Sequence, residues 1–253
     1  MPESANPQLR ALRQRIRALG QGRLCGRVLP FGLPAVDAVL PFGGLALGAL
    51  HEVLGAGADE EDGAVAAAFA AALLARLTRR HDGPVLWCLA TGDLYAPGLA
   101  ARGLAPECLI VARCRDDSDI LWAMEEGLRS AALAAVLGEI GTLAPTTGRR
   151  LQLACEAGGV TGFVLRRWRT AGTAASQRGA PSAAVTRWRV AAAPSRATGE
   201  PGLGLPLWRV ELVRCRGGAP AAWLMEESDA TGHVALAAEL ADRPADARLS
   251  RVG

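Results

Sequence analysis

The sequence contains no lysine, so all 28 of its cationic side chains other than histidine are arginine. A mechanism that needs a lysine Schiff base, a lysine general base or the phosphate-binding lysine of a nucleotide loop is therefore excluded. Richness in alanine, glycine and arginine together also indicates codon bias in a GC-rich genome. The missing residue type thus limits the chemistry without defining a function.

Long hydrophobic runs are also missing. The longest uninterrupted apolar run, residues 64–75, is well short of the ~20 residues that a transmembrane helix needs. The basic N-terminal segment has neither the apolar stretch nor the small-residue cleavage site of a secretory signal. We therefore expect a cytoplasmic protein without a membrane-spanning helix.

Metal-ligand spacing is absent too. The six cysteines form no C-x-x-C pair, and the three histidines, His51, His81 and His233, lie far apart in the sequence. Structural zinc sites normally show closely spaced Cys or His pairs. Acids at Asp116, Asp117 and Asp119 could suggest a metal, but acidic residues are common in the first turn of a helix. We expect reduced thiols, no metal and no cofactor.

Charge is unevenly distributed along the 253 residues. Residues 1–27 and 164–225 carry an excess of arginine, whereas residues 28–163 and 226–253 carry an excess of carboxylates. Segregation of this kind indicates an anionic partner.

Apolar strands alternate with amphipathic helices through most of the chain. Strands are expected at 51–55, 84–90, 108–114, 134–141 and 160–168, with helices at about 64–80, 95–103, 118–133 and from Thr146 or Thr147 to about 157. This order is typical of βαβ units with a parallel sheet covered on both faces. Residues 170–185 are expected to form a loop, followed by antiparallel strands at 186–192, 207–215 and 221–227.

Three parts of the chain follow from these patterns. Residues 28–235 form one α/β domain, and residues 236–253 a loosely ordered tail. Residues 1–27 include a basic amphipathic helix, which we interpret as a docking element for a partner or for DNA, the alternative being a helix folded onto its own domain. The residues that define this helix are Leu9, Leu12, Arg13, Ile16, Arg17 and Leu19.

A glycine-rich loop lies between the first expected strand and a long helix, where a nucleotide phosphate would sit on backbone N–H groups. The required pattern is G-x-x-x-x-G-K-[ST]. Neither register of the loop matches it, because acids or small apolar residues stand at the glycine, lysine and hydroxyl positions. The residues of this degenerate loop are Gly55, Gly57, Glu60, Glu61, Asp62, Gly63, Ala64 and Val65.

The acids of the loop, with Asp59, oppose a bound phosphate directly. Two like charges about 4 Å apart repel by roughly 4 kcal/mol at an effective dielectric near 20. We interpret the acids as groups that stabilise the N-terminus of the following helix in place of phosphate.

Residues 31–55 resemble the segment that leads into the P-loop of RecA-family recombinases. The matching positions are Gly32, Asp37, Leu40, Gly43, Gly44, Leu45, Gly48, Glu52 and Gly55. The order of strands and helices from there to about residue 227 fits the same core. The resemblance therefore implies a RecA-like fold with a mainly parallel sheet flanked by helices, antiparallel strands at its C-terminal edge and a degenerate P-loop.

Departures from the RecA pattern predict that the domain is a pseudo-ATPase and not an enzyme. The resemblance places Thr91 where RecA has its water-activating glutamate. The strand at 134–141 has Gly138 where the Walker B aspartate is expected, with Glu139 one place late.

A RecA-like chain of this length with a degenerate P-loop resembles the ImuA family, the accessory proteins of bacterial mutagenesis cassettes. This resemblance implies a non-catalytic adaptor role in damage-induced translesion synthesis. It implies as partners a polymerase-related ImuB protein and an error-prone DNA polymerase, with a RecA filament and DNA as further candidates. The alternative is a SulA-like inhibitor of a cell-division protein.

Arginines interleaved with tryptophans bracket the loop at 170–185, which matches in order the DNA-contacting loop of RecA. Guanidinium groups with adjacent aromatics suit phosphate contact and base stacking. The alternative is that the tryptophans belong to the core and the arginines form a solvated face. The candidate DNA or partner contacts are Arg166, Arg167, Trp168, Arg169, Arg187 and Arg189.

Overall fold

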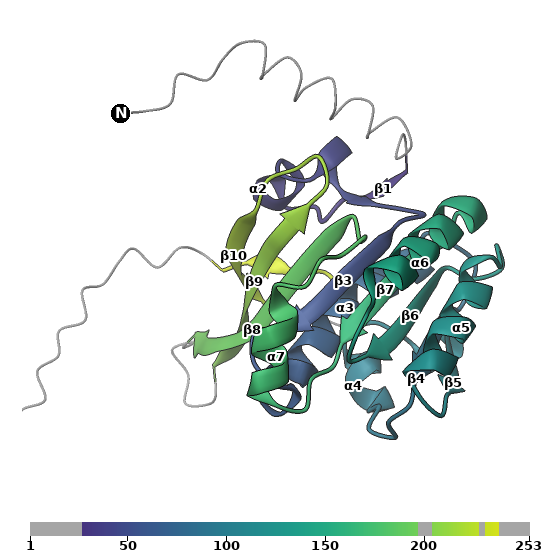
Figure 1. Cartoon of the computed structure of the whole chain (residues 1–253). Coiled ribbons are helices and arrows are strands. Elements are labelled where there is room, and N and C mark those ends of the chain that lie inside the picture. Colours follow the sequence, from purple (N-terminus) through teal and green to yellow (C-terminus); the bar gives the residue numbers. More distant parts are fainter. Residues whose placement is uncertain (1–26, 197–203, 228–230, 238–253) are drawn as a thin grey trace, which may run out of the picture.

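The computed structural model describes residues 27–196, 204–227 and 231–237 (Figure 1). Its centre is a sheet in the order β11-β10-β9-β8-β3-β7-β6-β4-β5. The strands are β3 (Leu50–Gly55), β4 (Val85–Leu89), β5 (Leu109–Arg113), β6 (Ala135–Ile140), β7 (Thr161–Arg166), β8 (Thr186–Arg196), β9 (Leu205–Cys215), β10 (Ala221–Glu226) and β11 (Ala235–Leu236). A small separate ladder joins β1 (Val28–Leu29) to β2 (Leu45–Ala46).

Strand direction divides the large sheet into two parts. Pairing is parallel from β8 through β3, β7, β6 and β4 to β5, and antiparallel from β8 through β9 and β10 to β11. The strands of the parallel part between the edges are buried on both faces, as their near-continuous apolar sequences predict. The predicted α/β class, a RecA-like core with antiparallel strands at the C-terminal edge, is confirmed.

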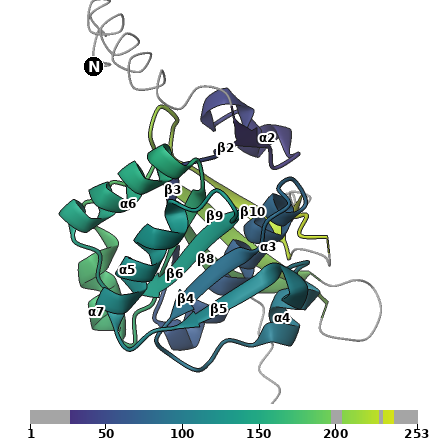
Figure 2. The ribbon, with the colours of Figure 1, turned by 90° about the vertical axis from the view of Figure 1, so that its right-hand side faces the viewer.

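Helices cover both faces of the parallel part (Figure 2). α3 (Ala64–Thr78) and α4 (Ala96–Ala101) lie on one face, and α5 (Asp117–Leu128), α6 (Pro145–Gly158) and α7 (Ala171–Arg178) lie on the other. The short α2 (Pro34–Asp37) lies beside the N-terminal ladder. The carboxyl ends of β3, β4, β6 and β7 therefore meet at one edge, where α/β proteins usually place their sites.

Tryptophan supplies much of the core on the α3 face. The Trp188 ring lies 5.3 Å from that of Phe31 and 5.7 Å from that of Phe69, and both Trp87 and Trp188 are fully buried. Many of the other core positions on α3 are alanines, which let this helix approach the sheet closely. Trp188 is thus a core residue, as the alternative interpretation of the tryptophans holds.

Two expectations about local structure are wrong. The expected loop at 170–185 contains α7, because Thr170 caps the helix by accepting a hydrogen bond from Thr173 N at 3.2 Å and Ala174 packs against Leu54 and Trp168. The small and polar residues of this segment give no sign that one of them, Ala174, is buried. α6 begins at Pro145 after Ala144, without a threonine cap, because proline is itself well suited to the first helical position.

The five cysteines in the described part of the chain are free thiols. Burial raises the pKa values of Cys88 and Cys155 to about 12, so both stay protonated at neutral pH. The prediction of reduced thiols is confirmed for these five.

Some predictions fall outside the described residues. These are the docking helix with Leu9, Leu12, Arg13, Ile16, Arg17 and Leu19, and residues 238–253 of the tail expected at 236–253. The start of that expected tail is ordered instead, because Leu236 pairs with Met225 as part of β11. Among the residues that are described, no helix is long and apolar enough to cross a membrane.

Candidate functional site

The loop after β3 folds back on itself through its own carboxylates. One oxygen of Asp62 accepts a hydrogen bond from Gly57 N at 2.7 Å, and the other accepts one from Ala192 N at 3.1 Å. A Cβ at Gly57 would collide with the Glu61 carboxylate, so a larger residue there would require the Glu61 side chain to move. The backbone donor that a phosphate would use is thereby occupied from within the chain.

The acids of the loop lie at the N-terminus of the helical segment that leads into α3. A π-helical turn, Asp59–Gly63, leads directly into α3, and no side chain caps either segment. The Asp59 carboxylate instead accepts hydrogen bonds from Trp168 N and Arg167 Nε, both at 3.0 Å. All four acids stand in the first turn of this helical segment, as the sequence interpretation requires, and Asp59 and Asp62 in addition bind the backbone of neighbouring segments.

Arg167 is the centre of a cluster at the carboxyl ends of the strands. Besides Asp59, its guanidinium donates to Glu139 Oε2 and to Asp93 Oδ2, each at 2.7 Å. Trp87 Nε1 donates to the second oxygen of Glu139 at 2.7 Å. One arginine therefore holds three carboxylates, and the Arg167 cluster (Asp59, Asp93, Glu139 and Arg167) has a formal excess of negative charge.

The pKa values of Glu139 and Asp93 in the Arg167 cluster are shifted in opposite directions. Burial raises the pKa of Glu139 above its ordinary value, although Arg167 and Trp87 oppose this. Hydrogen bonds from Thr91 and then Arg167 lower the pKa of Asp93. A raised pKa suits a general base, but both oxygens of Glu139 are already engaged.

A cavity of about 470 Å³ opens beside the Arg167 cluster. Small residues at the start of α3 form one wall, and Tyr95 and Leu99 contribute to another. Since the guanidinium of Arg167 is shared among three carboxylates, the polar end of this cavity disfavours a triphosphate.

Close packing against α5 explains why a glycine occupies position 138. A Cβ at this residue would collide with Met124 and Ile120 of α5, on the face of the sheet opposite the Arg167 cluster. Glu139, the next residue, points to the cluster side because side chains alternate along a strand. Glu139, which stands one position after the place where the RecA resemblance expects an aspartate, thus contacts Arg167 and Trp87.

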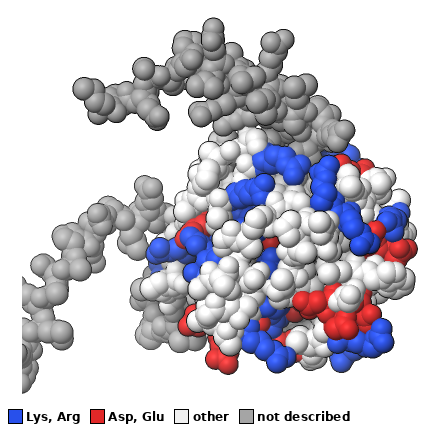
Figure 3. Space-filling model, in the orientation of Figure 1, with Lys and Arg blue, Asp and Glu red and all other residues white. Residues whose placement is uncertain are grey.

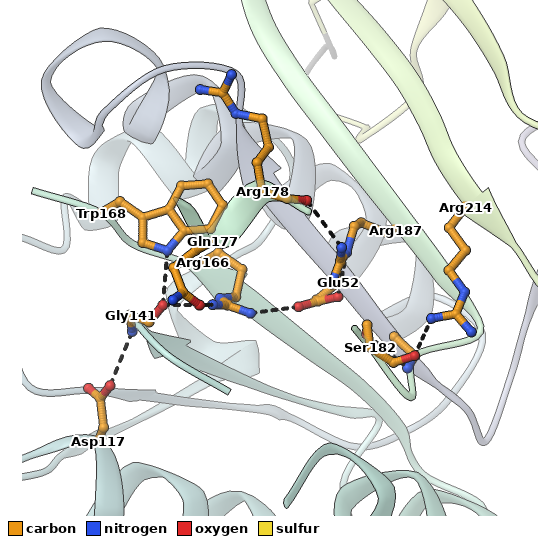
Figure 4. A network of polar contacts seen from close by, with 11 residues as sticks. Glu52, Asp117, Gly141, Arg166, Trp168, Gln177, Arg178, Ser182, Arg187 and Arg214 are labelled. Atoms are coloured by element: carbon orange, nitrogen blue, oxygen red, sulfur yellow. Dashed lines mark hydrogen bonds and ion pairs between the residues drawn. The ribbon is translucent and has the colours of Figure 1, made fainter. Parts of the chain in front are cut away.

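A second polar network lies within the sheet (Figure 4). Glu52 of β3 accepts hydrogen bonds from Arg166 Nη1 on β7 and from Arg187 Nε on β8, each at 2.8 Å. Side-chain exposure is 1% for Glu52, 2% for Arg166 and 8% for Arg187. Burial alone would raise the pKa of Glu52, but the two guanidiniums hold it below its ordinary value.

This network extends to α7, where Gln177 Oε1 accepts a hydrogen bond from Arg166 Nη2 at 3.3 Å. Arg166 and the Trp168 indole both donate to Gly141 O, at 2.8 and 2.9 Å. Arg166 also lies over the Trp168 ring, 5.4 Å from its centre. Gly141 N in turn donates to Asp117 at 3.2 Å, so the network ties β6, β7, β8 and α5 together.

Three of the candidate DNA or partner contacts are therefore corrected. Arg166, Arg187 and Trp168 are buried, because Glu52 and Gly141 supply intramolecular partners that the sequence pattern cannot show. Arg167 is partly exposed in its cluster, and Arg189 pairs with Glu211. Arg169 is exposed, so contact with DNA or a partner at this residue stays a prediction.

The acids considered for a metal have other roles. Asp116 caps α5 by accepting hydrogen bonds from Ser118 N and Asp119 N at 2.9 and 3.0 Å. Asp119 pairs with Arg115, and Asp117 binds Gly141 N. The described part of the chain holds no group of three or more His, Cys, Asp or Glu residues arranged for a metal ion.

Sequence reasoning missed two residues of these networks. Asp93 lies two residues after Thr91, beyond the end of β4, and the meeting of parallel strands at one edge was the available signal. The role of Glu52 was missed although an acid inside an apolar strand requires a counter-charge. Arg166 and Arg187, which lie in other expected strands, were the available candidates for the counter-charge of Glu52.

No protein-family model matches the chain. It is 44% identical over 222 residues to Protein ImuA of Caulobacter vibrioides in two strains, an alignment that spans 85% of this chain and 91% of the relative. Identity at this level over most of both chains requires a common fold and descent. The protein therefore belongs to the ImuA family.

Proposed function

We propose that this protein is a non-catalytic adaptor in DNA-damage-induced mutagenesis, built on an ATPase core that no longer binds nucleotide. The observation that carries the proposal is the pair of hydrogen bonds from Gly57 N and Ala192 N to Asp62. A bound phosphate would have to displace an anion that is already hydrogen-bonded there. The absence of lysine and the ImuA relationship support the same conclusion.

The proposed partners are the other members of a mutagenesis cassette. They are an ImuB-like, polymerase-related protein and an error-prone DNA polymerase, with a RecA filament as a further candidate. A rigid α/β core without catalytic turnover is suited to hold such proteins together, because its surface is available throughout the polymerase reaction. We further propose that it acts in the cytoplasm.

Nucleotide binding is the most direct test. The purified full chain is expected to show no saturable, magnesium-dependent binding of a fluorescent ATP analogue and no ATP turnover, because carboxylates occupy the loop. A RecA-type ATPase assayed in parallel serves as the positive control. Saturable binding that unlabelled ATP displaces would overturn the pseudo-ATPase part of the proposal.

The cellular role is tested separately. Deletion of the gene is expected to lower the frequency of mutations induced by DNA damage, and a pull-down from damaged cells should recover a polymerase-related protein. Overproduction should leave cell length unchanged. Filamentous cells, with mutation frequency unaffected by the deletion, would instead support the SulA-like alternative.

A further inference from the structure

Three arginines gather near the point where β8 begins and β9 ends. Arg214 belongs to β9 and Arg216 follows it, and Arg149 is the fifth residue of α6. Arg149 and Arg214 are exposed and Arg216 is half-buried. Figure 3 shows arginine side chains on the upper part of the molecular face that Figure 1 presents, the part where β9 ends.

A β-bulge directs Arg214 outward. The β8–β9 register pairs Arg187 with Arg214 and then Trp188 with Leu212, so Val213 is the extra residue. Val213 and Arg214 are consequently both exposed, although consecutive residues of a regular strand point to opposite faces. Bulges often redirect a side chain at a functional position.

Two of the arginines are held in place by backbone carbonyls. Arg214 Nη1 donates to Ser182 O, as Figure 4 shows, and Arg216 Nη2 donates to Ala183 O at 2.9 Å. A Cβ at Gly148, the residue before Arg149, would lie 3.6 Å from the Ala183 Cβ, so this part of α6 lies close to Ala183. The segment Ser182–Ala183 therefore holds the guanidiniums of Arg214 and Arg216, and Arg149 of α6 is near enough to act on the charge of Arg216.

Within the described part of the chain, no ion pair neutralises the charge of this cluster. None of the three arginines forms an ion pair with a carboxylate within residues 27–196, 204–227 and 231–237. Burial lowers the pKa of Arg216, and Arg214 and Arg149 lower it further, against a weaker opposite effect of Glu156. Arg187, which faces Arg214 across the strands, is by contrast neutralised by Glu52.

We propose that Arg149, Arg214 and Arg216 form a binding site for the phosphodiester backbone of a nucleic acid. Planar guanidinium groups bind phosphate oxygens bidentately, and each carbonyl-bound arginine retains further N–H donors for them. Phosphate contacts commonly use exposed arginines of this kind, which need no carboxylate partner in the protein. The site differs from the arginines that the sequence suggested and goes beyond the proposed adaptor function.

The test is the salt dependence of DNA binding by the full chain. Fluorescence anisotropy of a labelled single-stranded oligonucleotide, and of the matching duplex, is measured between about 50 and 200 mM salt. The double change Arg214→Ala/Arg216→Ala should weaken binding roughly tenfold or more at the lowest salt, and Arg149→Ala should weaken it less. Together the three changes should reduce the slope of log K against log salt by about 2 for a single strand.

The controls distinguish a phosphate site from a general loss of positive charge and from misfolding. Arg115→Ala removes one positive charge, as Arg149→Ala does, but from an exposed arginine paired with Asp119, and it should leave binding unchanged. Circular dichroism shows whether each variant is folded. Because Arg149 is exposed, Arg149→Ala still tests the site if the double variant does not fold. No DNA binding by the wild type, equal binding by all variants, or equal competition by polyglutamate would each overturn the proposal. Failure here would leave the nucleotide-binding test and the mutagenesis test unaffected.

Discussion

Glu52→Gln is expected to lower the free energy of unfolding by about 4 kcal/mol, measured by urea denaturation at neutral pH. Glutamine preserves the size of the side chain but removes the charge that faces Arg166 and Arg187. Both guanidiniums would then remain in the sheet without a counter-ion. Removing one partner of a buried ion pair typically costs about 3–5 kcal/mol, because the desolvated charge that is left has no compensation.

Glu211→Gln is the matched control. This residue pairs with Arg189 between neighbouring strands, but the two side chains are 25% and 32% exposed. Surface pairs of this kind contribute at most about 1 kcal/mol. Equal losses for the two variants would mean that burial of Glu52 does not make its pairing more important.

Arg167→Leu should have the second-largest effect, a loss of about 2–3 kcal/mol at neutral pH. The change leaves Asp59, Asp93 and Glu139 close together with no cation among them. Arg167 is 23% exposed, so water compensates in part and the loss should be smaller than at Glu52. Unfolding in urea measures it, with Arg129→Leu as the control because exposed Arg129 also holds two carboxylates.

The loss caused by Arg167→Leu should depend on pH. Burial raises the pKa of Glu139 in the folded protein, so its protonation favours the folded state, and that contribution disappears as pH rises through the folded pKa. Removing Arg167 raises this pKa further. The free energy of unfolding of the variant should therefore be close to that of the wild type in mildly acid solution. The difference between the two should be largest above neutral pH. A loss that grows as pH falls would contradict the assignment.

Local sequence patterns predicted most of the fold correctly. The strand and helix order, the parallel sheet and its antiparallel edge follow from apolar strand composition alternating with helical periodicity, since burial on two faces needs such residues. The same reasoning failed at residues 170–185, where one buried alanine and a threonine cap form α7. A short helix in small polar sequence has no periodicity strong enough to detect.

The candidate site was only partly predictable. The loop of acids was identified because a missing lysine and misplaced glycines can be read directly from the chain. The partners of those acids could not be read in this way. Asp62 binds the backbone of Ala192, and Arg167 joins Asp59, Asp93 and Glu139, residues that separate segments bring together.

The sequence by itself determined that no ammonium side chain is available for phosphate, that the chain forms an α/β domain and that its charges are segregated. Only the tertiary structure decided which arginines are buried counter-ions and which face solvent. Arg166 and Arg187 look the same as Arg214 and Arg216 in the sequence, yet the first two face Glu52 and the others gather around Ser182 and Ala183. The reason is that charge and periodicity are properties of neighbouring residues, whereas the dielectric environment of a side chain depends on elements packed against it from elsewhere in the chain.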